Sequence, residues 1–359
     1  MHYHRGLHRA QGSPDIRLQE EAGLNRIPRA PATAAEQRSL PQRLRERSQS
    51  LSAVRQFFLN LGFIEVETPA VLESPGHEPS LEPRRLLDGG WLLTSPEYHM
   101  KRLLATGSGP RIFQICRCFR GGERTHQHRP EFTMVEWYRA HAEYDRVAAD
   151  VERLVAHTAR AMRGSTVVDG PWGLVDLQPP WPRLSVTDAF RIFAGVDLGD
   201  GAAGDAGTLR GRAQDAGCES IDASDDWDSA FHKLLVERVE PGLASMGRGV
   251  HLRQYPAPLA ALSRLEPRDP SVAQRFESHA GGLELANGFG ELTDARLQRR
   301  RFRDERRTRQ ELGRPVLPLD EPFLRDLEGM PPASGVALGL DRLIMLVTAA
   351  ERIDDVVAF

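Results

Sequence analysis

The chain has 359 residues, of which 40% are hydrophobic, which is enough for one large packed domain or two smaller ones. Its net charge of -3 does not favour a nucleic-acid partner, because proteins that bind polyanions usually carry a strong basic excess. No apolar run reaches about 18 residues, which argues against a transmembrane helix. Three cysteines are too few for a disulfide framework, so a cytoplasmic location is expected.

The N-terminal segment differs in composition from the rest. Residues 1–41 are rich in Arg, Pro, Ala and Gln and have little apolar periodicity, so we expect a disordered extension there and a folded domain over 42–359. Apolar residues at helical spacing predict a helix over 43–60. A strand over 63–67 follows and ends before Pro69, which cannot donate to a sheet ladder.

The next elements are a short strand and helix, then a hairpin. The pattern predicts a strand over 91–94 and a helix over 96–105. Two strands joined by a charged loop are expected within 111–138. A strongly amphipathic helix is predicted over 144–162.

The middle of the chain is the hardest part to interpret. Residues 164–226 are dense in Gly, Asp and Pro, so we expect a variable insertion with one helix over 186–193. A further helix is predicted over 227–239, and strands over 249–254 and 274–291.

The C-terminal third begins with an arginine-rich helix over 294–312, whose charges are most simply a solvated face. A strand over 335–338 and a helix over 341–350 close the chain. Strands and helices follow one another without a regular βαβ alternation, which favours an α+β fold around an antiparallel sheet flanked by helices. The sequence lacks the glycine-rich loops of the common nucleotide-binding folds.

The segment RIFQICRCFRGGERTHQHRPEFTMVEWY, residues 111–138, places Arg120 at the entrance of the hairpin loop. A guanidinium presents two donors side by side, which suits a phosphate and a carboxylate held next to each other. That is the arrangement needed when an amino acid attacks the α-phosphate of ATP. An ordinary charged surface hairpin is the alternative.

A second segment, RFESHAGGLELANGFGELTD, carries three acids seven residues apart, Glu277, Glu284 and Glu291. Magnesium prefers hard oxygen donors and usually takes one or two carboxylates together with substrate phosphates, which leaves a third acid for an ammonium group. A solvated strand edge would explain the same pattern.

A third segment, SGVALGLDRLIML, places Gly339 just before a helix that starts with Asp341 and Arg342. Glycine leaves room for a flat base against the backbone, and the arginine could reach a terminal phosphate. A simple turn and helix cap is the alternative.

Together these segments resemble the three motifs of class II aminoacyl-tRNA synthetases: FIEVETP the first, FR…HRPEFTMVEWY the second and GLDRL the third. The TSPEYHMK and ELANGFGELTD segments are similar to the catalytic domain of lysyl-tRNA synthetases, over about residues 43–357. Only about 40 residues precede the domain, where bacterial lysyl-tRNA synthetases have an anticodon-binding domain. The chain therefore looks like the elongation factor P lysine ligases, and no recognition of a tRNA anticodon is expected.

The resemblance implies ATP- and Mg²⁺-dependent activation of (R)-β-lysine or lysine, transfer to a lysine of elongation factor P, and a homodimer. It gives catalytic roles to Arg120 and Arg342, and Mg²⁺ binding to Glu277 and Glu284. The residues implied for the amino acid are Ser95, Pro96, Glu97, Tyr138, Asn287 and Glu291. Those implied for the nucleotide are Arg120, Glu123, Arg129, Glu284, Leu285, Gly339 and Arg342.

The second motif departs from the lysyl-tRNA synthetase pattern at two positions. Glu123, which would read adenine, is displaced by one residue after Gly121 and Gly122. Arg129 replaces the usual asparagine, which adds either a phosphate contact or a charge that weakens ATP binding. Two other functions stay open: a ligase that acts on tRNA or a small molecule, and a binding protein without catalytic activity.

Overall fold

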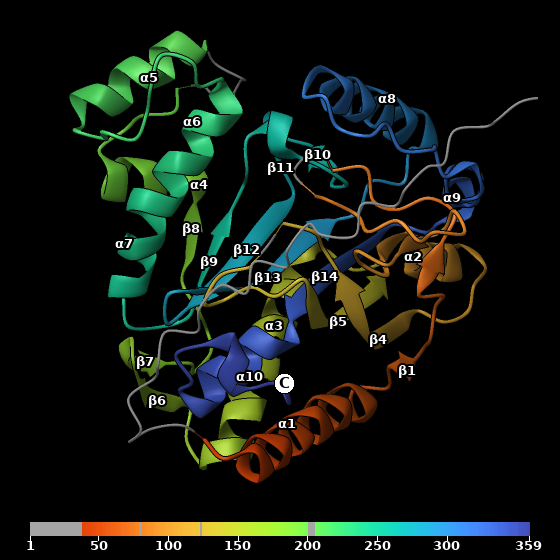
Figure 1. The fold of residues 1–359 in the computed structure, drawn as a ribbon, viewed down its shortest axis with the longest axis vertical. Helices are drawn as coiled ribbons and strands as arrows, with labels where there is room; N and C mark the ends of the chain where they lie inside the picture. The colour runs from red at the N-terminus through yellow and green to blue at the C-terminus, as the bar shows by residue number, and fades with distance from the viewer. Residues whose placement is uncertain (1–37, 79–80, 123, 200–204) are drawn as a thin grey trace, which may run out of the picture. The chain divides into compact units, whose positions relative to one another are not determined.

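The computed structural model describes residues 38–78, 81–122, 124–199 and 205–359 (Figure 1). Most of the expected N-terminal extension, residues 1–37, therefore lies outside the described part. The first helix of the described part is α1 (Leu40–Asn60). Its first turn is capped by the Ser39 hydroxyl, and Pro41 lies where a helix tolerates proline.

The main sheet of the described residues has eight strands, in the order β1-β4-β5-β14-β13-β12-β9-β8. The strands are β1 (Ile64–Glu65), β4 (Arg111–Phe119), β5 (Glu131–Ala140), β14 (Ala333–Gly339), β13 (Leu283–Gly290), β12 (Arg275–Ala280), β9 (Val250–Arg253) and β8 (Arg183–Ser185). The six central strands pair antiparallel, and the edge strands β1 and β8 pair parallel to β4 and β9. The expected α+β class with an antiparallel sheet is confirmed.

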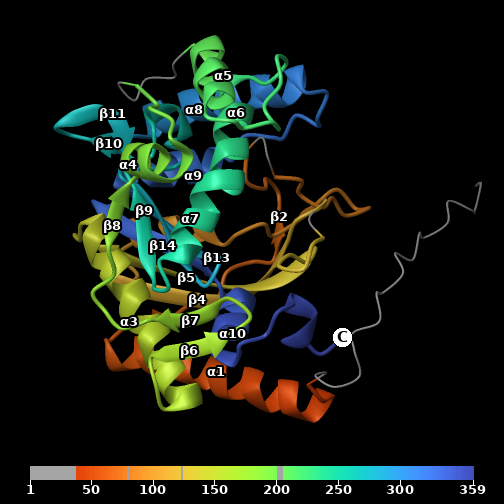
Figure 2. The same cartoon turned by 90° about the vertical axis from the view of Figure 1, so that its left-hand side faces the viewer.

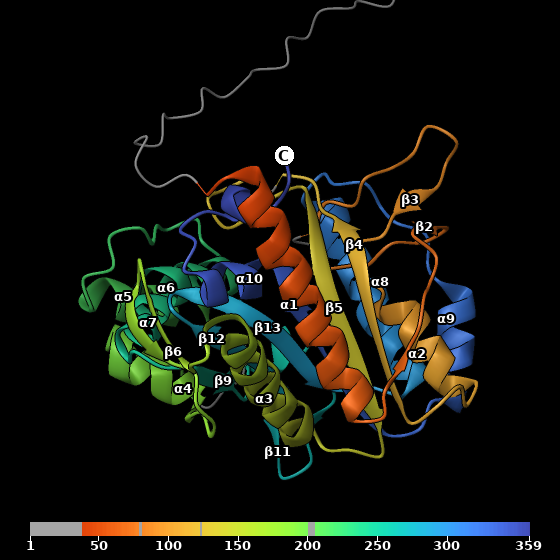
Figure 3. The same ribbon diagram turned by 90° about the horizontal axis from the view of Figure 1, so that it is seen from below.

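One face of the sheet is covered by α1, α3 (Tyr144–Arg163) and α10 (Leu340–Thr348), as Figure 3 shows. Side chains alternate along a strand, so Val135 and Trp137 of β5 point to the same side and are buried in this core. Although α1 and α3 have 21 and 20 residues, neither they nor any other described helix is long and apolar enough to span a membrane.

The opposite face of the sheet receives the other side chains of β5, Met134, Glu136 and Tyr138. Helices α2 (Glu97–Ala105), α8 (Ala295–Glu311) and α9 (Glu321–Asp326) pack together on this side, where the Tyr98 and Phe323 rings stack with centroids 4.5 Å apart. This face is thus only partly covered by helices.

Residues 164–226 contain more regular structure than one helix. The segment forms the hairpin β6 (Val167–Gly170) and β7 (Gly173–Asp176), the edge strand β8, the helix α4 (Val186–Ala189), a π-helical turn over Phe190–Ala194 and the helix α5 (Ala206–Asp215). Next come α6 (Trp227–Leu234), a π-helical turn over Leu235–Val239 and α7 (Glu240–Ser245). These helices share a second apolar core, and Figure 2 shows α4 to α7 gathered beside β8 and β9.

The remaining elements are short. They are the strand pairs β2 (Val71–Leu72) with β3 (Trp91–Leu92) and β10 (Leu265–Glu266) with β11 (Asp269–Ala273), and 3₁₀ turns at Ala257–Leu259, Leu327–Gly329 and Ile353–Asp355. Three of them add a buried residue to the apolar cores, namely Leu72, Leu327 and Ile353.

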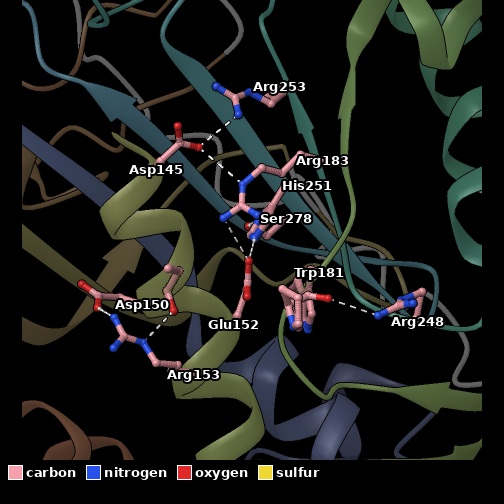
Figure 4. Close-up of polar contacts among 12 residues, drawn as sticks. Asp145, Asp150, Glu152, Arg153, Trp181, Arg183, Arg248, His251, Arg253 and Ser278 are labelled. Carbon is pink, nitrogen blue, oxygen red and sulfur yellow. Dashed lines mark hydrogen bonds and ion pairs between the residues drawn. The ribbon is translucent and has the colours of Figure 1, made fainter. Parts of the chain in front are cut away.

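A buried polar network joins α3 to the β8 edge of the sheet (Figure 4). The His251 Nε2 lies 3.1 Å from the Glu152 carboxylate, and its Nδ1 lies 2.9 Å from the Ser278 hydroxyl. Arg183 of β8 reaches the same carboxylate at 3.4 Å. Burial lowers the pKa of His251 despite this acid partner, so the ring is neutral near pH 7. The network therefore links helix and strands through hydrogen bonds, on the side of the sheet that α3 covers.

Candidate active site

A cavity of about 1330 Å³ lies on the partly open face of the sheet, between the central strands and helices α6 and α8. Several expected site residues line it: Ser95, Glu97, Arg120, Arg129, Glu284, Leu285, Asn287, Gly339 and Arg342. The three sequence segments therefore converge on one space. Four further expected residues, Pro96, Tyr138, Glu277 and Glu291, lie deeper in the fold, and Glu123 lies outside the described residues.

Strand pairing explains why polar residues of β12 and β13 gather on this side. Glu277 lies opposite Asn287, and His279 lies opposite Glu284, so these pairs share a face of the sheet. The two pairs are in phase only because Leu285 is an extra residue in β13, where the register shifts. Without this bulge, Glu284 would point to the opposite face from Asn287.

At one end of the site, Lys101 joins two of the expected amine-binding acids. Its Nζ lies 2.6 Å from Glu97 and 2.6 Å from Glu291, and both the lysine and Glu291 are 1% exposed. Lys101 follows Glu97 by four residues on α2, which places both side chains on one face of the helix. The ammonium therefore neutralises only part of the acid charge.

A third acid adds to this end. Glu136 is fully buried and accepts a hydrogen bond of 2.6 Å from the Tyr138 hydroxyl, two residues along the same face of β5. Burial and the nearby Glu97 raise the pKa of Glu136 well above its usual range. Burial also raises the pKa of Glu291 to about 7, although Lys101 opposes this shift. This end of the pocket thus holds Glu97 and Glu291 on one lysine, with Glu136 close to both acids, and it favours added positive charge.

Gly335 of β14 provides the space for these side chains. A methyl group at this position would come within 2.2 Å of the Tyr138 ring and 2.6 Å of a Glu291 carboxylate oxygen. Tyr138 and Gly335 are direct partners across the β5–β14 pairing. Only a residue without a side chain leaves both groups in their positions.

The other end of the cavity carries positive charge. The Arg120 guanidinium lies over the Phe132 ring, 5.1 Å from its centroid, and among the described residues its Nε has no hydrogen-bond partner. Arg342, in the first turn of α10, donates from Nη1 to the Glu284 carbonyl at 2.7 Å and approaches the Glu284 carboxylate at 3.2 Å. Both arginines have donors on the wall of the cavity, where an anionic ligand would meet them.

His128 completes the cationic end without adding charge. Burial and the neighbouring Arg342 lower its pKa to about 4, so the ring is neutral near pH 7. Its Nε2 then accepts from Arg342 at 2.5 Å, and its Nδ1 donates to the Thr125 hydroxyl at 2.8 Å. The histidine therefore orients the arginine.

Glu277 lies on the cavity face of β12, in contact with two basic groups. Arg275 donates to it at 2.7 Å, and the His279 Nε2 lies 3.5 Å from its other oxygen. Burial opposes ionisation, but these contacts outweigh it and lower the pKa of Glu277 to about 2. The carboxylate is ionised at neutral pH, as a metal ligand must be. Within the described residues no group of three or more His, Cys, Asp or Glu side chains is arranged to hold a metal.

Arg129 is paired with an acid from the end of the chain. Its Nη1 lies 2.9 Å from the Asp354 carboxylate, and the Ile353 amide donates to the His126 carbonyl at 2.8 Å. The loop between β4 and β5 is therefore attached to the C-terminal 3₁₀ turn. The added positive charge of Arg129 is balanced from within the chain.

The sequence did not single out every residue that shapes the site. Lys101 could have been found from its four-residue spacing to Glu97, and Glu136 from its two-residue spacing to Tyr138. Nothing in the sequence indicated a role for Glu305, because it lies among arginines on a helix whose charges suggest a solvent-exposed face. The missed residues of the cavity and its surroundings are Glu78, Lys101, Glu136, Glu305 and Gly335.

Comparison with known families identifies the family of the chain. The family model described as tRNA synthetases class II (D, K and N) matches residues 29–359. The chain therefore belongs to this family of class II synthetases.

Within this family, similar proteins carry one shared name. The chain is 39% identical over 327 residues to the elongation factor P–(R)-β-lysine ligase of Erwinia tasmaniensis, which covers 88% of this chain and 94% of the relative. It is 40% identical over 326 residues to the protein of that name from Haemophilus influenzae, with shares of 88% and 94%. The Salmonella arizonae protein of the same name is 39% identical over 332 residues, with shares of 89% and 95%. The likeness to elongation factor P lysine ligases is confirmed.

Proposed function

We propose that the chain is an ATP-dependent ligase that activates (R)-β-lysine or lysine and transfers it to a lysine side chain of elongation factor P. The observation that carries the proposal is the charge distribution of the cavity. Glu97 and Glu291 flank Lys101 at one end, with Glu136 close to both acids, and Arg120 and Arg342 lie at the other end. A diamino acid offers cations to the first end and, together with ATP, anions to the second.

The first step forms an aminoacyl-adenylate. A carboxylate oxygen of the amino acid bonds to the α-phosphorus of ATP, and the bond to pyrophosphate breaks. The carboxylate is already a nucleophile, so the protein needs to position the reactants and stabilise charge. We assign Arg120 to the α-phosphate and the amino-acid carboxylate, and Arg342 to the terminal phosphate. Gly339 and the backbone at Leu285 would lie beside the nucleotide.

The amino acid would lie between Arg120 and the acids. Ser95, Asn287 and the backbone at Pro96 would contact its polar groups, while Glu97 and Glu291 would pair its two amines. The excess of acid over Lys101 supports a positively charged ligand. Tyr138 would act through Glu136, whose charged form its hydroxyl stabilises.

Mg²⁺ would be held by Glu277 and Glu284. The donor chemistry fits, since both are carboxylates on the cavity face of adjacent strands and Glu277 stays ionised. When bound, the ion would supply positive charge to the phosphates. Arg275 and Arg342, which contact these acids, would then be freer to bind substrate oxygens.

The acceptor is proposed from the names of the relatives, which state elongation factor P and (R)-β-lysine. We further propose a cytoplasmic homodimer. The edge strand β1 and its neighbours expose the apolar side chains of Leu59, Ile64 and Val71, and Pro69 between them is exposed as well. Contact between copies would cover this surface.

Two measurements on the purified protein test the function. Pyrophosphate exchange into ATP should depend on the diamino acid, with (R)-β-lysine preferred over lysine. Labelled amino acid should then appear on elongation factor P, with the matching mass increase, and should not appear on tRNA. Label on tRNA alone would indicate a charging enzyme, and no exchange by folded protein at saturating ATP and Mg²⁺ would indicate a binding protein.

A further inference from the structure

Two acids of the cavity wall have no role in the first step. Glu78, in the segment after β2, and Glu305, on α8, both line the cavity. Each has a buried carboxylate oxygen, Oε2, that finds no hydrogen-bond partner in the described part of the chain. Buried carboxylate oxygens are rarely left unpaired, so a pair of them beside a cavity suggests a ligand that donates hydrogen bonds.

Two contacts fix the segments that carry these acids to each other. Arg309 follows Glu305 by four residues on α8, is 2% exposed, and donates to the backbone carbonyl of Glu78 at 3.1 Å. One turn earlier on the helix, Phe302 stacks on His77, with ring centroids 4.5 Å apart. The two acids thus come from segments more than 200 residues apart that are fixed to each other on both sides.

The arginine one turn before Glu305 on α8 does not complete the pair. Arg301 precedes Glu305 by four residues, but its Nη1 donates at 2.6 Å to two backbone carbonyls in the 261–263 loop. The guanidinium charge of Arg301 thus acts on Glu305, but its Nη1 donates its hydrogen bonds to the loop. The carboxylates of Glu78 and Glu305 therefore keep the capacity to bind a cation.

The charges around Glu305 make it a base suited to an amine. Burial raises the pKa of Glu305 to about 8, and the neighbouring Glu78 adds to the increase. Arg301 of the same helix lowers the pKa, whereas Asp304 and Glu97 of α2 raise it further. A carboxylate of this basicity can take a proton from an ammonium group far more readily than an ordinary one.

This wall of the cavity also reaches solvent. Asp304 and Thr308 of α8, and Leu312 directly after it, line the same cavity and are exposed, with Leu312 at 58%. Glu291, by contrast, is only 1% exposed. A side chain that belongs to another protein would enter along α8, while the amino acid would be enclosed near Glu291.

We propose that Glu78 and Glu305 form a second ammonium site, which receives the acceptor lysine of the protein substrate, with Glu305 as its proton acceptor. The assignment rests on the proposed function and deepens it. Arg309 is a positioning residue, since it acts by holding Glu78 against α8.

In the transfer step, the acceptor ammonium gives one proton to the Glu305 carboxylate. The neutral amine then attacks the carbonyl carbon of the aminoacyl-adenylate. A C–N bond forms, the C–O bond to the phosphate breaks, and AMP leaves with the bonding electrons. The second proton on nitrogen passes to Glu78 or to solvent, which leaves a neutral amide.

The test compares the two half-reactions in Glu305→Gln, Glu78→Gln and the control Glu311→Gln. Glu311 is an exposed acid on the same helix, and the described structure places it outside the cavity lining. Pyrophosphate exchange with (R)-β-lysine reports activation, and single-turnover transfer from preformed adenylate to elongation factor P reports the second step. We expect transfer by the cavity variants to fall by roughly 10- to 100-fold, at least ten times more than exchange. The control should change neither.

The pH dependence separates proton transfer from a structural role. The defect of Glu305→Gln should shrink as pH rises towards the ordinary lysine pKa of about 10.4, where the acceptor supplies its own neutral amine. Melting temperatures at neutral pH should stay equal, because a pKa of about 8 leaves Glu305 largely protonated and glutamine has nearly the same shape. A defect independent of pH, a loss of exchange as large as that of transfer, or normal transfer would overturn the assignment. If wild type performs exchange but never labels elongation factor P, the proposed function fails and the assignment fails with it.

Discussion

At the scale of single residues, Lys101 reduces the acid charge that the amino-acid pocket offers to its ligand. Two acids alone would bind any dication, but an ammonium already fixed between Glu97 and Glu291 leaves only part of their charge available. Glu291 has a pKa raised to about 7, so its protonation state changes in the physiological range. The pocket therefore couples amino-acid binding to loss of a proton.

Binding of the diamino acid should strengthen as pH rises from about 6 to 8. Below the raised pKa of Glu291 the acid is protonated and cannot pair with an amine, and above it the charge is present. In Glu291→Gln the pH dependence should disappear, and the KM for the amino acid should rise at least tenfold more than the KM for ATP. Calorimetric titration in buffers of different ionisation enthalpy measures the released proton. An equal effect on both substrates would contradict the assignment.

Gly335→Ala should damage the amino-acid pocket. The added methyl would meet the Tyr138 ring at 2.2 Å and Glu291 at 2.6 Å, and both neighbours are buried. We expect a loss of about 1–3 kcal/mol in the free energy of unfolding and a higher KM for the amino acid. Gly329→Ala is the matched control, because its nearest contacts are at 3.6 and 4.0 Å. Chemical denaturation and pyrophosphate exchange measure the two effects, and wild-type values for Gly335→Ala would refute the packing argument.

At the scale of elements, the loop between β4 and β5 is anchored by the C-terminal turn. Sequence reasoning left Arg129 between a phosphate contact and a harmful charge. Its ion pair with Asp354 offers a third interpretation, in which the charge is neutralised before ATP arrives. Since both side chains are partly exposed, the pair adds at most about 1 kcal/mol to stability.

Arg129→Asn should therefore change the KM for ATP less than threefold, with little change in melting temperature. Arg342→Lys should raise the KM for ATP at least tenfold, since lysine cannot reproduce the planar set of donors. Pyrophosphate exchange at varied ATP concentration distinguishes these results. A large rise in the KM for ATP in Arg129→Asn, not reproduced by Asp354→Asn, would mean that Arg129 contacts the nucleotide directly.

Most long elements could be predicted from sequence, because α1, α3 and the β4–β5 hairpin have clear apolar periods. The strands β6, β7 and β8 could not, since three or four residues between prolines and glycines show no period. The three charged segments of the site were identifiable from their residue types. The bulge at Leu285 and the meeting of Glu78 with Glu305 depend on strand register and tertiary contacts, which leave no local signal.

At the scale of the whole molecule, the proposed homodimer would use the exposed edge of the main sheet. Strand β1 lies at the end of the strand order, and Ile64 on it is 49% exposed. Neighbouring apolar side chains, Leu59 at 52% and Val71 at 54%, enlarge the surface. An edge of this kind usually pairs or is covered.

Sedimentation velocity should show a dimer at micromolar concentration. Ile64→Glu should raise the dimer dissociation constant at least tenfold, because two buried charges would face each other across a symmetric contact. Val167→Glu, on the distant β6 strand and 46% exposed, is the matched control. A wild-type monomer, or an unchanged dimer in Ile64→Glu, would contradict this interface.

The extra residue in β13 makes this strand sensitive to its length as well as to its composition. Deleting Leu285 would remove the bulge and restore regular pairing with β12, and Glu284 would still point to the same side as Asn287, two residues away. If the strand kept its full length and paired without the bulge, Glu284 would instead turn towards α3 and α10. The phosphate end of the cavity would then be disconnected from the amino-acid end without loss of any charged group.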